Sequence, residues 1–337
     1  MTHEIIKNSE RIIKAGTLIL GALSIAAVAA ETGASVRDQR GRSNKAEVVS
    51  NIRPGEYATF TVPGYHSEGH ILAKNLDRHF EDMGTTHYAV HPEKGFSLDS
   101  IREEWLKARA LDGHRPARIY AMSMGGLLVA KIFSDEGFRR EFGPVDKLVL
   151  DSALSGKKDL SVKEKIAMGL ATVLPVSHTT NKLYHLLSQE DLGEEIDHAP
   201  EVMPEEVHER LGASALINFS AGKGQILFMR REYVENIPLA GFGAEIERGT
   251  TYLASTCDTV VDTERSVTVY AKSLEQDVEY RIDTLRKFTS AHAGGRERPQ
   301  GAKDALLDQY PERYRIRTIR HLLSDLSPDN PDLEPAA

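Results

Sequence analysis

Cysteine is nearly absent from this chain, because Cys257 is the single cysteine among 337 residues. A disulfide framework and a cysteine-rich metal site each need several cysteines, so both are excluded. A long basic block is also missing: the formal net charge is −8 at pH 7, and the 27% of charged residues are spread along the chain. A protein that binds a phosphate backbone usually has a cluster of lysines and arginines, and this sequence has no long block of them. We therefore expect no nucleic-acid partner.

The sequence also lacks the common motifs for metals and nucleotides. His and Glu occur together in HPEKGFSLDS and HEIIK, but neither stretch has the HExxH spacing of a zinc site. The stretch PGYHSEG has neither the GxGxxG spacing nor the Lys-Ser/Thr pair of a phosphate-binding loop. We therefore predict no metal site and no cofactor.

A hydrophobic run long enough to cross a bilayer comfortably is missing as well. The uncharged stretch AGTLILGALSIAAVAA covers residues 15–30 and is shorter than the roughly 20 residues of a spanning helix. It follows lysines and an arginine and ends on small residues, which is typical of an export signal. We expect residues 1–30 to place the protein outside the cytoplasm, secreted or anchored. The alternatives are an uncleaved membrane anchor, lengthened by Ile12 and Ile13 if Lys14 snorkels, and a buried helix.

The chain does have enough apolar residues, 40%, for one large domain with an insertion or for two modest domains. From Val48 onward, short apolar runs alternate with amphipathic segments. This alternation predicts an α/β fold with a mostly parallel central sheet and helices on both faces. The expected strands are 57–62, 86–91, 117–122, 147–154, 250–256 and 278–283.

Amphipathic helices are expected at 70–84, 97–113, 125–138, around 265–274 and, at the end of the fold, around 312–323. In the second of these, Ser97 and Ser100 are candidate caps. Its expected buried stripe consists of Ile101, Trp105, Ala108 and Leu111.

The alternation of strands and helices stops between residues 156 and 243, where helix-like segments follow one another without a clear strand. We therefore predict an inserted all-helical cap over 156–243. The core then consists of a first part at 47–155 and a second part at 244–325. The remaining segments are the signal peptide or membrane anchor at 1–30, a polar linker at 31–46 and an acidic, proline-rich tail at 326–337 that is expected to be disordered.

The stretch RIYAMSMGGLLVAKIF, residues 118–133, places Ser123 between a strand pattern and a helix pattern. A serine hydroxyl becomes a nucleophile when a base removes its proton and N–H donors stabilise the oxyanion that forms. A tight strand-to-helix turn presents the hydroxyl above the sheet beside a helix N-terminus, and it requires small neighbours. Ala121 and Gly125 are such neighbours, so the pattern is AxSxG, one methyl group away from GxSxG. The alternative is a serine that only allows close packing of helix and sheet.

From about residue 46 to 325 the chain resembles the α/β-hydrolase family. Beside the Ser123 turn, the resemblance depends on VPGYHSEG after an early strand, TYLASTCDTVVD after a late strand and TSAHAGG in a late loop. It implies that the N–H groups of Tyr65 and Met124 form the oxyanion hole. It also implies Ser123 as nucleophile, Asp258 as the orienting acid and His292 as the general base.

The resemblance implies a serine hydrolase that transfers an acyl group to water. An esterase or lipase acting on a small-molecule or lipid-like ester is the first expectation, although amidases, peptidases and thioesterases use the same residues. Asp151 and Asp262 are the alternative acids. The competing histidines are His66, His87, His91 and His321. A non-catalytic binding protein of the same fold is the rival class, since Ala121 and Pro63 depart from the family's pattern.

Overall fold

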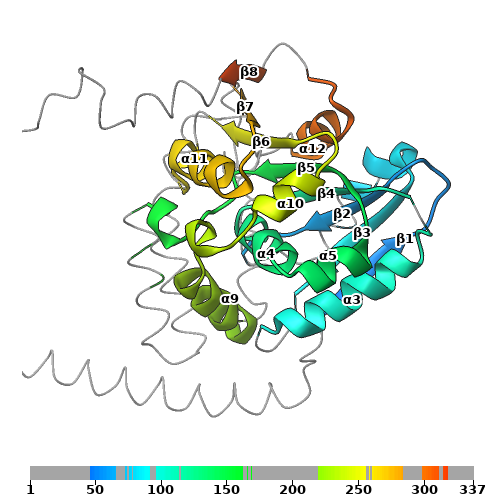
Figure 1. The fold of residues 1–337 in the computed structure, drawn as a ribbon, viewed down its shortest axis with the longest axis horizontal. Helices are drawn as coiled ribbons and strands as arrows, with labels where there is room; N and C mark the ends of the chain where they lie inside the picture. The colour runs from blue at the N-terminus through cyan, green and yellow to red at the C-terminus, as the bar shows by residue number, and fades with distance from the viewer. Residues whose placement is uncertain are drawn as a thin grey trace, which may run out of the picture.

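The computed structural model describes residues 46–65, 73, 76–77, 79–91, 96–113, 115–161, 165, 168, 219–255, 258, 260–283, 298–310 and 314–317. Within these residues the chain forms an eight-stranded sheet in the order β1-β3-β2-β4-β5-β6-β7-β8 (Figure 1). The two edge strands, β1 and β8, pair antiparallel with their neighbours. All other neighbouring strands pair parallel, which confirms the expected mostly parallel sheet.

The strands of the sheet are short, as expected for this class. Every residue of the central strands β2, β4 and β5 is buried, because layers of helices cover both faces of a parallel sheet. The bounds are β1 Glu47–Asn51, β2 Ala58–Val62, β3 Thr85–Val90, β4 Ala117–Met122, β5 Val145–Asp151, β6 Thr250–Ser255, β7 Val278–Asp283 and β8 Tyr314–Arg317.

The helices cover both faces of the sheet, and each face has its own apolar cluster. The larger cluster includes residues of α3, α4, α5, α10 and α11, and the smaller one lies under α12 and the segment around Leu76. The bounds are α3 Leu98–Ala110, α4 Met124–Phe133, α5 Glu136–Phe142, α9 Phe219–Arg231, α10 Ala240–Glu245, α11 Thr263–Leu274 and α12 Arg298–Leu307, with 3-10 turns η2 Glu81–Met83, η3 Lys157–Asp159 and η4 Val234–Asn236.

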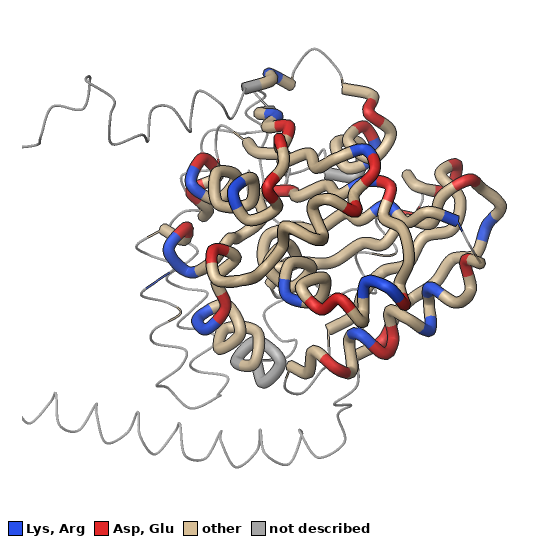
Figure 2. The backbone as a smooth tube through the Cα atoms, in the orientation of Figure 1, with Lys and Arg blue, Asp and Glu red and all other residues tan. Residues whose placement is uncertain are grey.

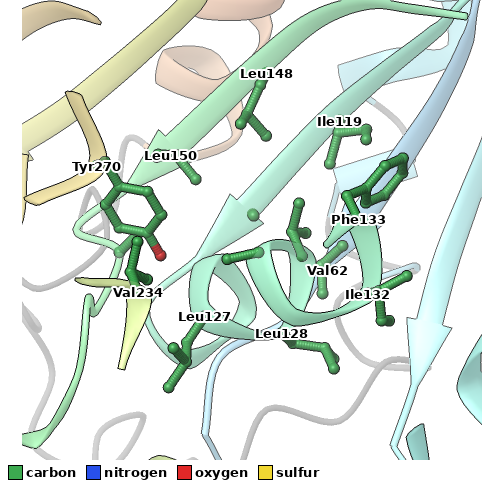
Figure 3. Close-up of a cluster of buried hydrophobic side chains, with 14 of the residues drawn as sticks. Val62, Ile119, Leu127, Leu128, Ile132, Phe133, Leu148, Leu150, Val234 and Tyr270 are labelled. Carbon is green, nitrogen blue, oxygen red and sulfur yellow. The ribbon is translucent and has the colours of Figure 1, made fainter. Parts of the chain in front are cut away.

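Helix α4 is the central helix of the larger cluster. Nearly all of its residues are buried, which is the pattern of a core helix that is apolar all round. Figure 3 shows Leu127, Leu128, Ile132 and Phe133 of this helix among side chains from β2, β4, β5 and α11. Because its side chains are packed on all sides, the start of α4 is fixed at the carboxyl end of β4.

Charged residues lie mostly on the outer helices and near the ends of elements, while the middle of the sheet is largely uncharged (Figure 2).

The C-terminal elements correct part of the sequence prediction. The helix expected around 312–323 is wrong at its described residues, because Tyr314–Arg317 forms β8 and pairs with β7. The alternation Tyr-Arg-Ile-Arg has the period of a strand, and an edge strand tolerates Ile316 at 63% exposure. Helix α12 was not expected, and it covers the second face of the sheet.

The helix expected at 97–113 is confirmed as α3, with one correction to its buried stripe. Ser97 is the N-cap, since its side chain accepts a hydrogen bond from the Ser100 N–H. The Ser100 hydroxyl instead accepts a hydrogen bond from the Ala46 N–H at 2.9 Å. Leu111 is 58% exposed rather than buried, because the helix ends at Ala110 and Leu111 occupies the C-cap.

Several expectations concern residues outside the described ones. They include the export signal or anchor at 1–30, the linker apart from Ala46, and the tail at 326–337. None of the helices within the described residues combines the length and hydrophobicity that crossing a membrane requires. The described part of 156–243 contains η3, α9, η4 and the start of α10, and the bounds of the cap stay a prediction.

Candidate active site

Ser123 has a strained backbone at the junction between β4 and α4. Its φ of 48° and ψ of −119° are rare for a residue with a side chain, and such strain persists only where the surroundings enforce it. The Ser123 N–H donates to the Asp151 carbonyl at 2.9 Å. The Ser123 carbonyl accepts hydrogen bonds from the N–H groups of Gly126 at 3.1 Å and Leu154 at 3.0 Å. The turn is thus fixed from both sides.

The small residues around Ser123 have a clear steric reason. A Cβ at Gly125 would lie 2.5 Å from the Val62 carbonyl oxygen, so any larger residue would push the turn away from the end of β2. A Cβ at Gly64 would lie 3.0 Å from the Ser123 Cβ. Ala121, in contrast, is completely buried within β4, so the fold accommodates the methyl group that separates AxSxG from GxSxG.

The predicted oxyanion donors belong to two segments that meet at Ser123. Met124 is the first residue of α4 and directly follows Ser123. Tyr65 follows Gly64, and Gly64 lies against the Ser123 side chain. The helix N-terminus adds a partial positive charge at this place. Both segments therefore meet beside the Ser123 side chain, and the role of the Tyr65 and Met124 N–H groups stays a prediction.

The three candidate acids have different surroundings. Asp258 follows β6 and forms a tight turn, in which its Oδ1 accepts hydrogen bonds from the N–H groups of Val260 at 2.9 Å and Val261 at 3.0 Å. Asp262 is the N-cap of α11, and its side chain accepts the Arg265 N–H at 3.1 Å. Asp151 is buried at the end of β5, where its carboxylate accepts the Tyr120 hydroxyl. All three follow or end a strand at the carboxyl edge of the sheet, and the role of Asp258 as the acid stays a prediction.

The predicted base, His292, lies outside the described residues, and so do His66 and His321. The ring of His87 is occupied elsewhere: its Nδ1 is 2.8 Å from the Ser50 hydroxyl and its Nε2 is 2.8 Å from Asp112 Oδ1. His91 is buried, and its Nε2 is 3.3 Å from the Pro63 carbonyl oxygen. Among the described histidines, neither ring nitrogen of His87 nor the Nε2 of His91 has Ser123 as its partner.

Asp159 supports the Asp258 turn and was not identified from the sequence. Its carboxylate accepts the N–H of Ser155 at 2.6 Å and the hydroxyl of the same residue at 2.7 Å, and it pairs with Arg265 at 3.2 Å. Burial raises the pKa of Asp159. Its carbonyl accepts the Asp262 N–H at 2.7 Å. The segment after β5 thereby stabilises the turn that contains Asp258. This pairing joins residues far apart in the sequence, so no local pattern predicts it.

The described residues offer no metal site, since none of their His, Cys, Asp and Glu side chains gather in a group of three or more that could hold an ion.

The fold matches many solved structures, whereas no protein-family model and no curated protein matches the chain. MenH from S. aureus is 13% identical, with a TM-score of 0.53 over 78% of this chain and 96% of its own. An esterase from Exiguobacterium antarcticum is 12% identical, with a TM-score of 0.56 over 78% and 95%. A structure titled as the putative non-heme bromoperoxidase BpoC from Mycobacterium tuberculosis is 14% identical, with a TM-score of 0.53 over 78% and 94%. These similarities show that the chain has the α/β-hydrolase fold.

Proposed function

We propose that the protein is a serine hydrolase that cleaves an ester-type substrate through an acyl-enzyme on Ser123. The observation that carries the proposal is the Ser123 backbone, at φ 48° and ψ −119° between β4 and α4. A strained residue of this kind costs about 1–3 kcal/mol, and such strain is concentrated at functional sites. Here it presents a hydroxyl beside a helix N-terminus at the carboxyl edge of a parallel sheet, where α/β folds bind their ligands.

The proposed mechanism uses the three residues that the family resemblance implies. His292 removes the proton from the Ser123 hydroxyl while the oxygen attacks the carbonyl carbon of the ester. The N–H groups of Tyr65 and Met124 stabilise the resulting oxyanion. His292 then protonates the leaving alcohol, and a water activated by the same ring releases the acid. Asp258, held by its two backbone N–H bonds, orients the ring and stabilises its cationic form.

Esters are the proposed substrate class, as small-molecule or lipid-like molecules. The fold is shared with an esterase structure, and the same machinery can also cleave thioesters, amides or peptides. A non-catalytic binding protein of this fold is the alternative function. Ala121, which replaces the first glycine of the GxSxG pattern, gives this alternative little support. Ala121 is buried, and the strained turn at Ser123 forms in its presence.

A fluorophosphonate probe and a series of p-nitrophenyl esters test the proposal. We expect the full-length protein to be labelled and to hydrolyse at least the short-chain esters, and we expect Ser123→Ala to abolish both. Ser50→Ala is the matched control, since the Ser50 hydroxyl contacts the His87 ring and Ser50 lies on β1, 73 residues before Ser123 in the sequence. Folded wild-type protein that is neither labelled nor active on esters, thioesters and amides would favour the binding protein.

For location, we propose that residues 1–30 carry the protein out of the cytoplasm, where it is secreted or associates with the membrane through this segment. The support is the sequence pattern of a basic start, an uncharged stretch and small residues at its end. N-terminal sequencing of the protein from its native host measures this. An intact Met1 on protein from a soluble cytosolic pool would contradict export.

A further inference from the structure

His91 contacts the loop that carries Tyr65. It follows the last residue of β3, and only 9% of it is exposed. Its Nε2 is 3.3 Å from the Pro63 carbonyl oxygen, and the Gly64 backbone is its second polar neighbour. Burial lowers the pKa of His91 to about 4, so the ring is neutral near neutral pH. Near neutral pH the His91 ring therefore forms hydrogen bonds as an uncharged group.

The partner of His91 determines which ring nitrogen carries the proton. A neutral imidazole has one N–H donor and one acceptor nitrogen. A carbonyl oxygen can only accept, so the contact with Pro63 requires the proton on Nε2. Because proline has no N–H, the carbonyl is the only backbone group of Pro63 that can form a hydrogen bond with His91.

The peptide that His91 contacts is the one that touches the nucleophile. A Cβ at Gly64 would lie 3.0 Å from the Ser123 Cβ and 3.6 Å from the Ser123 Oγ, so this backbone has almost no room to move toward the serine. The Tyr65 N–H, the proposed oxyanion donor, belongs to the next peptide, whose carbonyl is that of Gly64. His91 also forms a hydrogen bond with the Gly64 backbone. A displacement of the backbone at Pro63 and Gly64 would therefore shift the Tyr65 N–H, and catalytic donors need to be placed within about 0.5 Å.

Aromatic side chains hold the His91 ring in place. Its centroid is 5.7 Å from the Phe96 ring, and Phe96 in turn is 4.8 Å from Phe228 of α9. Phe228 and the ring of His91 are both buried. The ring thus has an apolar support on one side and the oxyanion loop on the other.

We propose that His91 is a positioning residue: its neutral ring donates Nε2–H to the Pro63 carbonyl and thereby fixes the loop that presents the Tyr65 N–H to the oxyanion. This inference deepens the proposed hydrolase function and rests on it. In this role His91 does not act on the substrate itself, because it works through the backbone from Pro63 to Tyr65.

The test compares variants that remove the donor with one that keeps it. His91→Phe and His91→Met cannot donate, whereas His91→Gln keeps a side-chain N–H. On a p-nitrophenyl ester, we expect the first two to lower kcat by about 10- to 100-fold with little change in KM, because a misplaced donor weakens only the transition state. His91→Gln should recover most of this loss. The inhibition constant of a trifluoromethyl ketone, which forms an oxyanion on Ser123, should rise by the same factor as kcat/KM falls.

Two outcomes separate this inference from the proposed function. Wild-type protein without turnover or probe labelling would end both. An active wild type whose Phe and Met variants keep kcat and the inhibition constant, or whose Gln variant loses as much as the Phe variant, would overturn only the role of His91.

A measurement on the unmodified protein does not depend on how the variants fold. Ring-nitrogen NMR at pH 7 should find His91 neutral with its proton on Nε2, assigned by the signal missing in His91→Gln. A proton on Nδ1, or a cationic ring, would overturn the inference whether or not the protein is active.

Discussion

A serine lies at each of two edges of the same sheet, and the two serines differ in their backbone and in their partners. At the carboxyl edge, Ser123 leaves β4 through a strained turn. At the amino edge, Ser50 of β1 contacts His87 of β3, and His87 contacts Asp112. Both contacts measure 2.8 Å. By residue type alone, the second group is a complete Ser-His-Asp chain.

The backbone explains the difference between the two edges. Ser50 lies directly opposite His87 in an antiparallel ladder, and it is not among the residues with a positive φ, whereas Ser123 is. No helix begins at Ser50, whereas α4 begins directly after Ser123. Residue types therefore define a reactive serine less well than the turn that presents it and the N–H groups around it.

The charges at the amino edge have a structural role instead. The side chains of His87 and Asp112 are fully buried, and Asp112 Oδ2 is 3.4 Å from Arg109 Nη1. Arg115 approaches the other oxygen of the carboxylate at 3.6 Å. This network ties β1, β3 and the loop before β4 together. The buried polar groups at this edge are thus paired with one another, as the stability of a fold requires.

The largest effect expected is the loss of hydrolysis in Ser123→Ala. Without the nucleophile, kcat should fall by about 10⁴-fold or more, since removal of a triad serine leaves only oxyanion and binding contributions. Ester hydrolysis and fluorophosphonate labelling measure this, with circular dichroism to verify folding. Ser50→Ala should keep wild-type activity. If Ser50→Ala lost labelling and Ser123→Ala kept it, the assignment of the two edges would be reversed.

The next largest effect concerns the acid. Asp258→Asn keeps the shape of the turn but not the charge, so kcat should fall by about 10³- to 10⁴-fold because the base is no longer oriented and stabilised. Asp262→Asn is the matched control, since it can still cap α11 and should change kcat by less than about 3-fold. A loss of similar size in Asp151→Asn, with Asp258→Asn active, would instead make Asp151 the acid.

The fold around Ser123 could be predicted from the sequence because its signals are local. Strand β4 has the predicted bounds 117–122, and the turn after it depends on Gly125, only two residues from the serine. The C-terminal part was harder, since the Tyr-Arg-Ile-Arg stretch of β8 becomes a strand only by pairing with β7. A pairing partner across the sheet is not visible in a local pattern.

The candidate site shows the same division. The turn of Asp258 is local, because its hydrogen bonds reach only Val260 and Val261. His91 was considered only as a competing base, since its contact with Pro63 spans 28 residues. Asp159 went unnoticed because its carboxylate pairs with Arg265 across the fold. His292 lies outside the described residues, and its role as base stays a prediction.

Removing Asp112 should separate stability from activity. Asp112→Asn leaves the buried Arg109 without its carboxylate partner, and breaking a buried charge network in this way costs about 3–5 kcal/mol. Urea unfolding should therefore show a much lower midpoint, while the kcat of the folded enzyme is unchanged. Ser50→Ala, which removes one hydrogen bond to the same network, should cost only about 1 kcal/mol. A large loss of kcat in folded Asp112→Asn would contradict the division of roles.

The smallest effect is a pH dependence of stability that arises near the amino edge, at Lys147 of β5. Its side chain is 3% exposed and pairs with Asp308, and burial lowers its pKa to about 8 from 10.5 in the unfolded chain. Asp146 and Glu279 oppose this lowering of the pKa, while Arg118 and Arg281 add to it.

Between these two pKa values the unfolded chain binds more protons at this lysine than the folded chain does. Its contribution to the free energy of unfolding therefore rises with pH, by at most about 1.4 kcal/mol per pH unit. Urea unfolding of the wild type and Lys147→Met between pH 7 and 10.5 measures the difference. The rise should be smaller in the variant, while ester hydrolysis at pH 8 should be the same in both, since no contact of Lys147 reaches the Ser123 turn among the described residues. An equal rise in both proteins would contradict the lowered pKa of Lys147 and show that the pairing with Asp308 offsets its burial.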